Sequence, residues 1–411
     1  MAKELTTKQN MLYNTIGSVF YLACQWLITI IVVHLGNFDM AGNLTVAISL
    51  SNTFSTIATY GVKNYQVSDM KNTYSSSEYV SNRLFTCIAS LLLAIGFLSL
   101  NTHYTSAQMG IIFAYIFYRI VEAFTDVLQG IQQKAFRMDY IGIELSIRGI
   151  TTLVGFTAGL YFFHSLILAI CFMIIPTLLV ILTFDIPISL KLDRFKPIIN
   201  KHLFSILKHC FPLMITSFLT TNIVTIPRYF LEKIQGSTIA GYYGSVATPT
   251  VIIQSLCLII YSPLVPLLAR AYTDNKHSDY KKIMSKALFA MLTISILFCL
   301  AAILLGRWGL HLLFGDAILP YTYLFTPIVL TTIMMAFLYF FTMVLTIARR
   351  TWTIVISTGC AALAVTLLSK SMIHAYSMDG VNYCLYIGLA VALLIMIVVW
   401  ITDTLKHFTN K

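Results

Sequence analysis

The sequence is poor in charge. Only 10% of its 411 residues are Asp, Glu, Lys or Arg, whereas 58% are hydrophobic. Soluble domains carry about 25% charged and about 45–50% apolar residues, so this chain could not cover a surface in water. Disordered chains are less hydrophobic, and outer-membrane barrels show segments of alternating polarity. The composition therefore predicts an all-α polytopic membrane protein.

Motifs of common enzymes are also missing. The chain contains no GxxxxGK[ST] phosphate loop, no GxSxG turn and no HExxH metal motif. Its eight cysteines lie in or beside apolar segments without a CxxC pair, so neither a disulfide framework nor a metal site is expected. The loops predicted on the outer side are too short for a typical external active site. We therefore expect no enzyme activity, no catalytic residues, no metal and no cofactor.

Long apolar runs are abundant, and twelve segments reach the roughly 20 residues that a spanning helix needs. These are residues 11–34, 40–62, 80–100, 108–131, 140–162, 165–187, 211–232, 238–268, 284–306, 318–347, 351–373 and 380–402. The longest hydrophilic stretch, 189–208, divides them into two sets of six. We therefore predict two six-helix lobes, 1–190 and 211–411, joined by a cytoplasmic or interfacial linker at 191–210, as in transporters with parallel repeats.

Basic residues predict the orientation. The chain has 27 Lys and Arg against 16 Asp and Glu, a net charge of +11, and no nucleic-acid-binding module is recognisable. Of these 27 basic residues, 21 lie in the termini or in the loops predicted on the same side of the membrane as the termini, with Lys63 and Arg83 included. Three lie in loops on the opposite side. Cytoplasmic loops are enriched in Lys and Arg. Both termini are therefore expected in the cytoplasm, and nucleic acid is not an expected partner.

The linker has an amphipathic composition of its own. Residues 195–210 read FKPIINKHLFSILKHC and combine basic with large apolar side chains. Such a segment can rest on an anionic lipid surface as an interfacial helix. The alternative is a solvated connection between the two lobes.

Ionisable residues inside the spans are the most informative feature. The span 108–131 carries Arg119, Glu122 and Asp126, at spacings of three and four that place them on one stripe of a helix. A charge at mid-span costs about 2.5–3.5 kcal/mol, so this stripe should face a partner helix or a water-filled cavity. The next span adds Glu144 and Arg148. A Glu122–Arg148 pair is geometrically reasonable and would leave Arg119 without an obvious partner.

These charges have two interpretations. They either clamp two helices together or take part in transport. For Arg119 we favour an anion-binding role, and the acidic residues Glu122, Asp126 and Glu144 are candidates for coupling to H⁺ or Na⁺. Arg228, about one turn inside the end of the span 211–232, either reaches the lipid headgroups or lines a cavity.

Several stretches, taken in order, resemble one known family. They are LYNTIGSVFYLACQWL (12–27), LQGIQQKAFRMDYIG (128–142), FSILKHCFPLMITSF (204–218), PRYFLEKIQGSTIAGYYG (227–244) and SPLVPLLARAY (262–272). The chain resembles the polysaccharide-transporter, or oligosaccharide flippase, branch of the multidrug/oligosaccharidyl-lipid/polysaccharide exporter superfamily. No single motif is sharp, and it is their order that carries the resemblance.

The resemblance implies a V-shaped, two-lobe fold like that of the superfamily's multidrug exporters, which alternates between inward-open and outward-open states. It implies a substrate in which a glycan is joined through phosphate or pyrophosphate to a polyprenol. By position, Arg228 falls on the family's arginine in the seventh helix and Asn14 lies early in its first helix. Arg119 and Arg148 fall where intramembrane cations occur, and Tyr118 offers a face for sugar stacking. Pro227 replaces an acid found in many relatives, which leaves the coupling ion open.

The leading hypothesis is translocation of a polyprenyl-(pyro)phosphate-linked oligosaccharide across a bacterial plasma membrane by alternating access. The expected partners are this lipid-linked glycan and membrane lipid, with H⁺ or Na⁺ and glycan-assembly enzymes as further candidates. One alternative is a cation-coupled multidrug antiporter of the same superfamily, and another is a membrane enzyme of envelope glycan assembly. The charges of the spans 108–131 and 140–162 sum to −1 and Arg228 restores zero, so charge does not decide between them. The order of the motifs favours the flippase.

Overall fold

The computed structural model describes residues 6–69, 73–101, 103–198, 202–250 and 264–409. These residues form helices and short connections, without a strand in the described part. Nine of the described helices are long and apolar enough to cross a membrane. The all-α membrane fold class is therefore confirmed, while the count of twelve spans stays a prediction. The segment expected at 238–268 includes residues 251–263, which lie outside the described residues.

The chain divides into two compact units, Met1–Thr221 and Asn222–Lys411, which we call unit 1 and unit 2. The boundary falls inside α9 (His202–Gln235), which begins nine residues before the span expected at 211. The second half of the expected linker is therefore helical.

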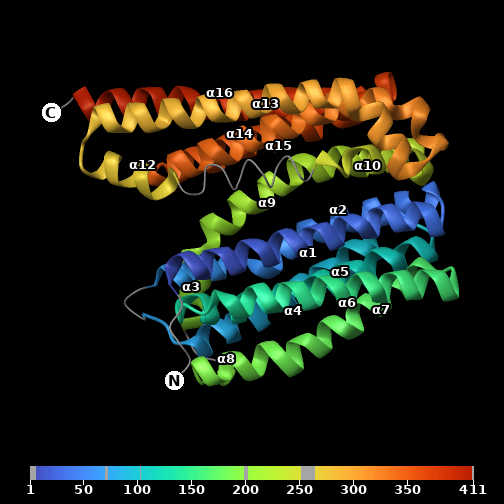
Figure 1. Cartoon of the computed structure of the whole chain (residues 1–411), viewed down its shortest axis with the longest axis horizontal. Helices are drawn as coiled ribbons and strands as arrows, with labels where there is room; N and C mark the ends of the chain where they lie inside the picture. The colour runs from blue at the N-terminus through green and yellow to red at the C-terminus, as the bar shows by residue number, and fades with distance from the viewer. Residues whose placement is uncertain (1–5, 70–72, 102, 199–201, 251–263, 410–411) are drawn as a thin grey trace. The chain divides into compact units, whose positions relative to one another are not determined.

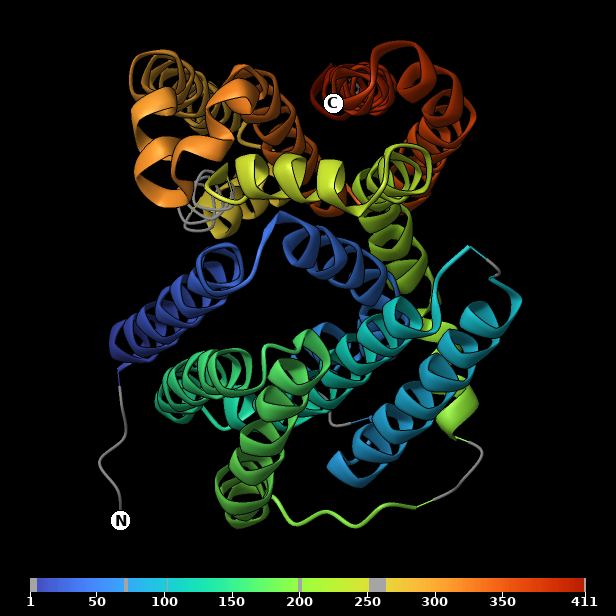
Figure 2. The same ribbon diagram turned by 90° about the vertical axis from the view of Figure 1, so that its right-hand side faces the viewer.

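The described residues of unit 1 form ten helical elements, counting the part of α9 before the boundary. The others are α1 (Thr7–Leu35), α2 (Phe38–Thr59), α3 (Val62–Ser68), α4 (Ser76–Leu100), α5 (Ser106–Lys134), α6 (Met138–Phe163), α7 (Leu166–Val180), the π-helical η1 (Ile181–Asp185) and α8 (Ile186–Leu192). The long helices run alongside one another (Figure 1), and Figure 2 views them closer to end-on. α5 is central, because it packs against α2, α4, α6 and α7.

Local sequence explains where these helices begin. α1, α4 and α5 each start with a capping box, in which Thr6, Ser75 and Thr105 exchange hydrogen bonds with the residue three positions later. α6 has no such cap of its own. Instead, the side-chain oxygen of Asn10 accepts a hydrogen bond from the Met138 N–H at 2.8 Å. This bond ties the start of α1 to the start of α6.

α1 and α6 approach closely because glycines meet at their crossing. A methyl group at Gly17 would collide with the backbone of Gly142, and one at Gly142 would collide with the carbonyl of Tyr13. Small residues allow such backbone contact between helices in membranes. The contact brings Tyr21, one turn further along α1, to the interior face of α6.

The described part of unit 2 contains the end of α9 and seven further elements. They are α10 (Ser237–Ala247), α12 (Leu264–Thr273), α13 (His277–Phe314), the 3₁₀-helical η2 (Asp316–Leu324), α14 (Phe325–Ile347), α15 (Thr351–Tyr376) and α16 (Met378–Thr409). α16 packs along α15 and α14. At one end of this unit Arg350 pairs with Asp403 at 2.6 Å.

The connection before α9 lies on the first turns of α4. The Ser76 hydroxyl donates to Asp193 at 2.5 Å, and Ser81 accepts the N–H of Ile198 at 2.7 Å. Ile206, early in α9, is buried in the core of unit 1, whereas Phe204 is 70% exposed. This part of the chain is thus attached to unit 1, and its proposed place on a lipid surface stays a prediction.

One carboxylate connects the residue after α3 with residues just before and early in α4. Asp69 accepts hydrogen bonds from the N–H of Thr73 at 3.0 Å, the N–H of Tyr74 at 3.1 Å and the hydroxyl of Tyr79 at 2.9 Å. Burial alone raises the pKa of Asp69, but these donors outweigh that effect, and the pKa lies below its ordinary value. The ionised carboxylate therefore holds the end of α3 against the start of α4.

We predict that Asp69→Asn lowers the free energy of unfolding by about 1 kcal/mol at pH 7. Because the pKa of Asp69 is lower in the folded state, its contribution is complete above the unfolded pKa of about 3.9 and is lost as the pH falls through the folded value. Thermal unfolding of the two proteins in detergent from pH 7 to pH 3 checks this. A difference in Tm that stays constant over that range contradicts the role of the ionised carboxylate.

Candidate functional site

The interior of unit 1 holds a group of ion-paired side chains, which we call the Glu122 cluster: Arg119, Glu122, Glu144 and Arg148. Arg119 Nη1 lies 2.5 Å from Glu122 Oε2. Arg148 Nε lies 3.1 Å from Glu144 Oε1 and 3.7 Å from Glu122 Oε1. The expected Glu122–Arg148 proximity is therefore present. The expectation that Arg119 lacks a partner is wrong, because Glu122 lies between both arginines.

Hydroxyl groups complete the surroundings of Glu122. Tyr21 on α1 and Tyr118 on α5 both donate to Glu122 Oε1, the second at 3.0 Å. The guanidinium of Arg148 lies 5.0 Å from the centre of the Tyr21 ring and donates to the Thr125 hydroxyl at 2.9 Å, so its charge also gains a cation–π contact. Tyr118 is fully buried, and it positions this carboxylate rather than presenting a face to a sugar in this conformation.

A second group, the Asp126 cluster, consists of Lys63, Arg83 and Asp126. Asp126 Oδ2 lies 2.6 Å from Arg83 Nη2, and Oδ1 lies 3.6 Å from Lys63 Nζ. Arg83 is fully buried and also donates to the carbonyl of Ala58 at 2.8 Å. Counting Arg83 with the loop cations was therefore wrong. It lies on the second turn of α4, and its counter-charge comes from α5, far away in sequence.

Gln129 joins the two clusters. Lys63 Nζ donates to Gln129 Oε1 at 2.8 Å, and Gln129 Nε2 donates to Glu144 Oε2 at 3.0 Å. Lys63 and Gln129 therefore connect Asp126 to Glu144. Polar side chains in contact with one another form a continuous chain from α3 through α5 to α6.

The stripe expected on α5 faces two sets of partners. Glu122 is directed to α1 and α6, whereas Asp126 is directed to α3 and α4. Four residues advance a helix by one turn and about 40° more. That rotation is enough to turn side chains at neighbouring levels toward different helices in a tightly packed unit.

Asp185 is a further acidic residue that sequence reasoning missed. It is fully buried at the end of η1, and neither of its carboxylate oxygens has a hydrogen bond of normal geometry within the described residues. Its ionised or polar neighbours are Glu144, Arg148 and Gln132. π-helical turns are frequent at functional sites. A lone acid in the apolar span 165–187 was the signal that could have identified it.

Together with Asp185, the two clusters contain four basic and four acidic side chains. The basic ones are Lys63, Arg83, Arg119 and Arg148, and the acidic ones are Glu122, Asp126, Glu144 and Asp185. Arg148 is enclosed at 5% exposure, whereas Arg119 is 30% exposed and extends toward Asn52 at 3.4 Å. Of the two arginines proposed for substrate here, Arg119 is therefore the accessible one.

Arg228 in unit 2 has a different environment. It lies on α9 and is partly buried, and its Nε is buried without a hydrogen-bond partner. Among the described residues no carboxylate pairs with it, and Tyr243 is its titratable neighbour. The Tyr243 hydroxyl is itself committed to Asn382 at 2.9 Å. Arg228 thus presents a positive charge that the described part of the chain does not neutralise.

Asn14, the remaining predicted site residue, lies on α1 where Gly142 of α6 packs against its backbone. It is partly buried. The neighbouring asparagine on the same face, Asn10, has the defined structural role of capping α6. Within unit 1 the structure therefore brings Arg119, Tyr118, Arg148 and the three acids into joined clusters, and no printed side-chain contact ties Asn14 to them. Arg228 belongs to unit 2.

Comparison with known proteins identifies the family. Residues 8–272 match the model of the family described as "Polysaccharide biosynthesis protein". The chain belongs to this family. A relative from Staphylococcus aureus, "Capsular polysaccharide biosynthesis protein CapF", is 25% identical over 311 residues, which cover 75% of this chain and 77% of the relative. The resemblance inferred from the order of motifs is thereby confirmed.

Solved structures show that this chain has the fold of a known superfamily. "Lipid II flippase MurJ" superposes with a TM-score of 0.75 over 97% of this chain and 90% of its own, at 14% identity. The "MATE multidrug transporter DinF-BH" gives 0.70 over 100% and 98%, at 11% identity. At such identities the likeness concerns the fold alone. The chain is a multi-pass membrane protein with the fold of the multidrug/oligosaccharidyl-lipid/polysaccharide exporter superfamily.

We predict opposite stability effects for two arginines. Arg148→Met removes the partner of Glu144 and should cost about 3–5 kcal/mol, because it leaves an uncompensated buried charge. Arg228→Met removes a cation that has no partner in the described chain, and it should leave the unfolding free energy unchanged or higher. Thermal unfolding of both variants in the same detergent checks this. Equal destabilisation would contradict the assignment of Arg228 as unpaired.

Proposed function

We propose that this polysaccharide biosynthesis protein carries a polyprenyl-(pyro)phosphate-linked oligosaccharide across the plasma membrane by alternating access, without changing it chemically. The observation that carries the proposal is the partly buried Arg228, which has no carboxylate partner among the described residues and lies on a helix long and apolar enough to span a membrane. A charge in a low-dielectric setting is unfavourable unless it meets a counter-charge. A phosphate group is a strong partner for a guanidinium.

The family supports a glycan as the rest of the substrate. The family description and the name of the Staphylococcus aureus relative both refer to polysaccharide biosynthesis, and one solved structure with this fold is named a flippase. Arg119, with its 30% exposed side chain, is a second candidate contact. Arg148 and Tyr118 position the Glu122 carboxylate that pairs with Arg119. Asn14, near the start of α1, remains a candidate substrate contact. In this proposal both termini are cytoplasmic, and glycan-assembly enzymes are candidate partners.

A multidrug antiporter is the second candidate function, because the fold is shared with a structure named a multidrug transporter. The charge distribution disfavours it. An organic cation would be repelled by Arg228, and Glu122, Asp126 and Glu144 already face cations of the same unit.

We predict that deleting the gene, with downstream genes intact, causes lipid-linked glycan intermediates to build up on the inner leaflet. Sensitivity to cationic dyes should stay unchanged. In the deleted strain, Arg228→Ala should restore translocation at least about tenfold less well than the wild-type gene, because a charge-assisted hydrogen bond contributes about 1.5–3 kcal/mol. Quantifying the intermediates by mass spectrometry checks both points.

Lys233→Ala is the matched control for this experiment, because Lys233 is an exposed cation on the same helix that lies over the Tyr229 ring at 5.8 Å. It should restore translocation fully. Normal intermediates together with raised dye sensitivity in the deleted strain would replace the flippase proposal with drug export.

We further predict that the acids of unit 1 couple transport to an H⁺ or Na⁺ gradient. Glu122, Asp126 and Glu144 are the proposed coupling residues, and the buried Asp185, whose neighbours include Glu144 and Arg148, joins them. Glu122→Gln and Asp126→Asn should each reduce the dependence of transport on an imposed gradient. Transport rates in vesicles with either gradient test this, and unchanged gradient dependence in both variants rejects it.

A further inference from the structure

Unit 2 holds two buried hydrogen-bond donors that its described residues do not satisfy. Within those residues, two buried side-chain polar atoms lack a hydrogen-bond partner: Nε of Arg228 on α9 and Nδ2 of Asn382 on α16. Both atoms are donors. Buried polar atoms in folded proteins are nearly always hydrogen-bonded, so each exception requires an explanation.

Tyr243 on α10 relates the two donors to each other. Its hydroxyl donates to Asn382 Oδ1 at 2.9 Å, and Arg228 is the cation that interacts electrostatically with the same hydroxyl. Arg228 lies seven residues before the end of α9, and Tyr243 lies six residues after the start of α10. At 1.5 Å per residue both are about 9–10 Å from the turn that joins these helices. Both donors therefore belong to the surroundings of one tyrosine.

The hydrogen bond from Tyr243 determines which part of the Asn382 amide is free. The amide oxygen accepts the hydroxyl hydrogen, which leaves the NH₂ group with two donors. Asn382 and Tyr243 are each 1% exposed, so neither side chain has room to turn away. The set that remains consists of guanidinium and amide N–H groups. Such groups bind the oxygens of an anion, whereas a metal cation would need oxygen ligands.

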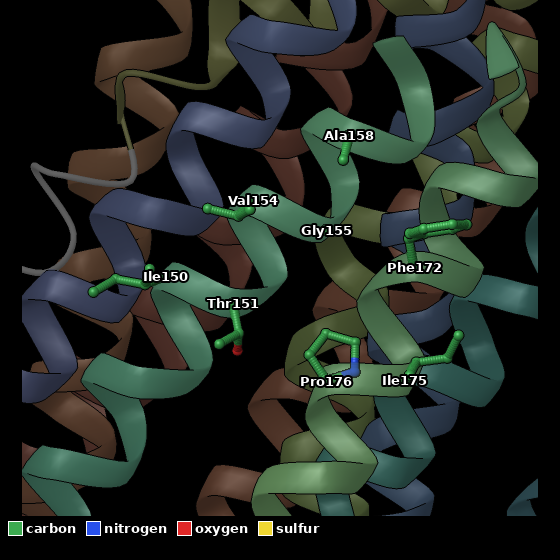
Figure 3. A pocket seen from close by; sticks show the side chains of 8 residues that line it. All are labelled: Ile150, Thr151, Val154, Gly155, Ala158, Phe172, Ile175 and Pro176. Carbon is green, nitrogen blue, oxygen red and sulfur yellow. The ribbon is translucent and has the colours of Figure 1, made fainter. Parts of the chain in front are cut away.

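Unit 1 provides a contrast. Arg83, Arg119 and Arg148 also have an Nε without a hydrogen bond, but each has a carboxylate partner. The groove between α6 and α7 is lined by apolar residues and Thr151, whose hydroxyl donates to the backbone of its own helix at 2.9 Å (Figure 3). Neither arrangement resembles the pair of donors in unit 2.

Two carboxylates near these donors limit what charge alone can do. Asp379, three residues before Asn382, interacts electrostatically with the Tyr243 hydroxyl. Glu232, four residues after Arg228, is buried. In the described chain neither of them pairs with Arg228. Because their negative charge offsets the attraction of one guanidinium, an anion needs direct hydrogen bonds to stay bound. The amide of Asn382 can supply them without a further charge.

We propose that Asn382 is a second anion-binding residue of unit 2. Its amide and the Arg228 guanidinium donate to oxygens of one phosphate or diphosphate group, and Tyr243 is the positioning residue that orients the amide. The inference rests on the proposed function for the identity of this group, which is the phosphate of the transported lipid. Donors from two helices suit a tetrahedral group, whose oxygens point in several directions.

The first test measures binding of inorganic diphosphate, without Mg²⁺, to the full chain in phosphatidylcholine nanodiscs by isothermal titration calorimetry. Asn382→Leu should raise the Kd at least tenfold, as expected for loss of a hydrogen bond to a charged group. Tyr243→Phe should raise it by a smaller factor, because the amide is retained but no longer held. Tyr383→Phe, at the next residue of α16 on a 42% exposed side chain, is the matched control and should leave the Kd unchanged.

A double variant separates loss of binding from loss of folding. Asn382→Leu alone leaves the Tyr243 hydroxyl buried without its acceptor and should lower the melting temperature. Combining it with Tyr243→Phe removes both partners, which is close to neutral for stability. The double variant should therefore melt at a higher temperature than Asn382→Leu and still bind diphosphate weakly. Binding that recovers together with the melting temperature would overturn the proposal.

A charge introduced at position 382 tests whether the two donors share one site. Asn382→Asp places a carboxylate where the anion is proposed to bind, so it should abolish diphosphate binding and pair with Arg228. Arg228→Met should then lower the melting temperature in the Asn382→Asp background, although it does not do so in the wild-type background. An equal effect of Arg228→Met in both backgrounds would show that the two side chains do not meet, and would overturn the proposal.

Ordinary phospholipid headgroups are the other source of phosphate. When part of the phosphatidylcholine is replaced by phosphatidylglycerol, the ratio of the Kd values of Asn382→Leu and wild type should stay unchanged. A ratio that falls to one would assign the site to ordinary headgroups and reject its role for the transported lipid. Equal diphosphate affinity of Asn382→Leu and wild type in phosphatidylcholine, or no binding by the wild type, also rejects the site.

Failure of this site and failure of the proposed function give different results. If the deleted strain shows normal lipid-linked intermediates while diphosphate binding depends on Asn382, the anion site stands in a protein that does not translocate the lipid. If intermediates accumulate and Asn382→Leu restores translocation as fully as the wild-type gene does, translocation stands and Asn382 is rejected as a substrate contact.

Discussion

Hydrocarbon does not solvate charge, and this constraint determines how unit 1 is assembled. The Glu122 carboxylate meets this constraint because the guanidinium groups of Arg119 and Arg148 lie next to it, and the hydroxyls of Tyr21 and Tyr118 donate hydrogen bonds to it. These groups come from α1, α5 and α6, so the three helices can pack only in an arrangement that brings them to one carboxylate. The glycine contacts between α1 and α6 serve this requirement, because they let Tyr21 approach closely enough.

The same constraint gives the two units different chemical characters. In unit 1 each interior cation lies next to a carboxylate, and the clusters are joined through Gln129 into one polar chain. In unit 2, Arg228 lies on a spanning helix without a counter-charge among the described residues. An external anion would neutralise it, which is the basis for proposing a phosphate-bearing substrate.

Much of this architecture could be predicted from the sequence. Charge content and apolar runs indicated a helical membrane protein, and the order of several weak motifs indicated the family. The acids and arginines of the spans 108–131 and 140–162 were recognised because they interrupt apolar segments. Spacing along one helix shows which side chains share a face, but not which neighbouring helix that face meets. For this reason the partners Tyr21 and Arg83 were missed, and Arg119 was expected to be unpaired. α9 and α13 are longer than predicted because hydropathy does not register helical turns whose residues are polar.

The most direct test of the account is translocation by the purified full chain in proteoliposomes. The substrate is a fluorescent polyprenyl-diphosphate-linked oligosaccharide, and its transfer between leaflets is followed by quenching with a membrane-impermeant reductant. The account predicts that the wild-type protein accelerates transfer and that Arg228→Ala slows it about tenfold, as expected for loss of one charge-assisted contact, with an unchanged melting temperature. Equal rates for the two proteins, or no acceleration by the wild-type protein while it exports a cationic dye, would contradict it.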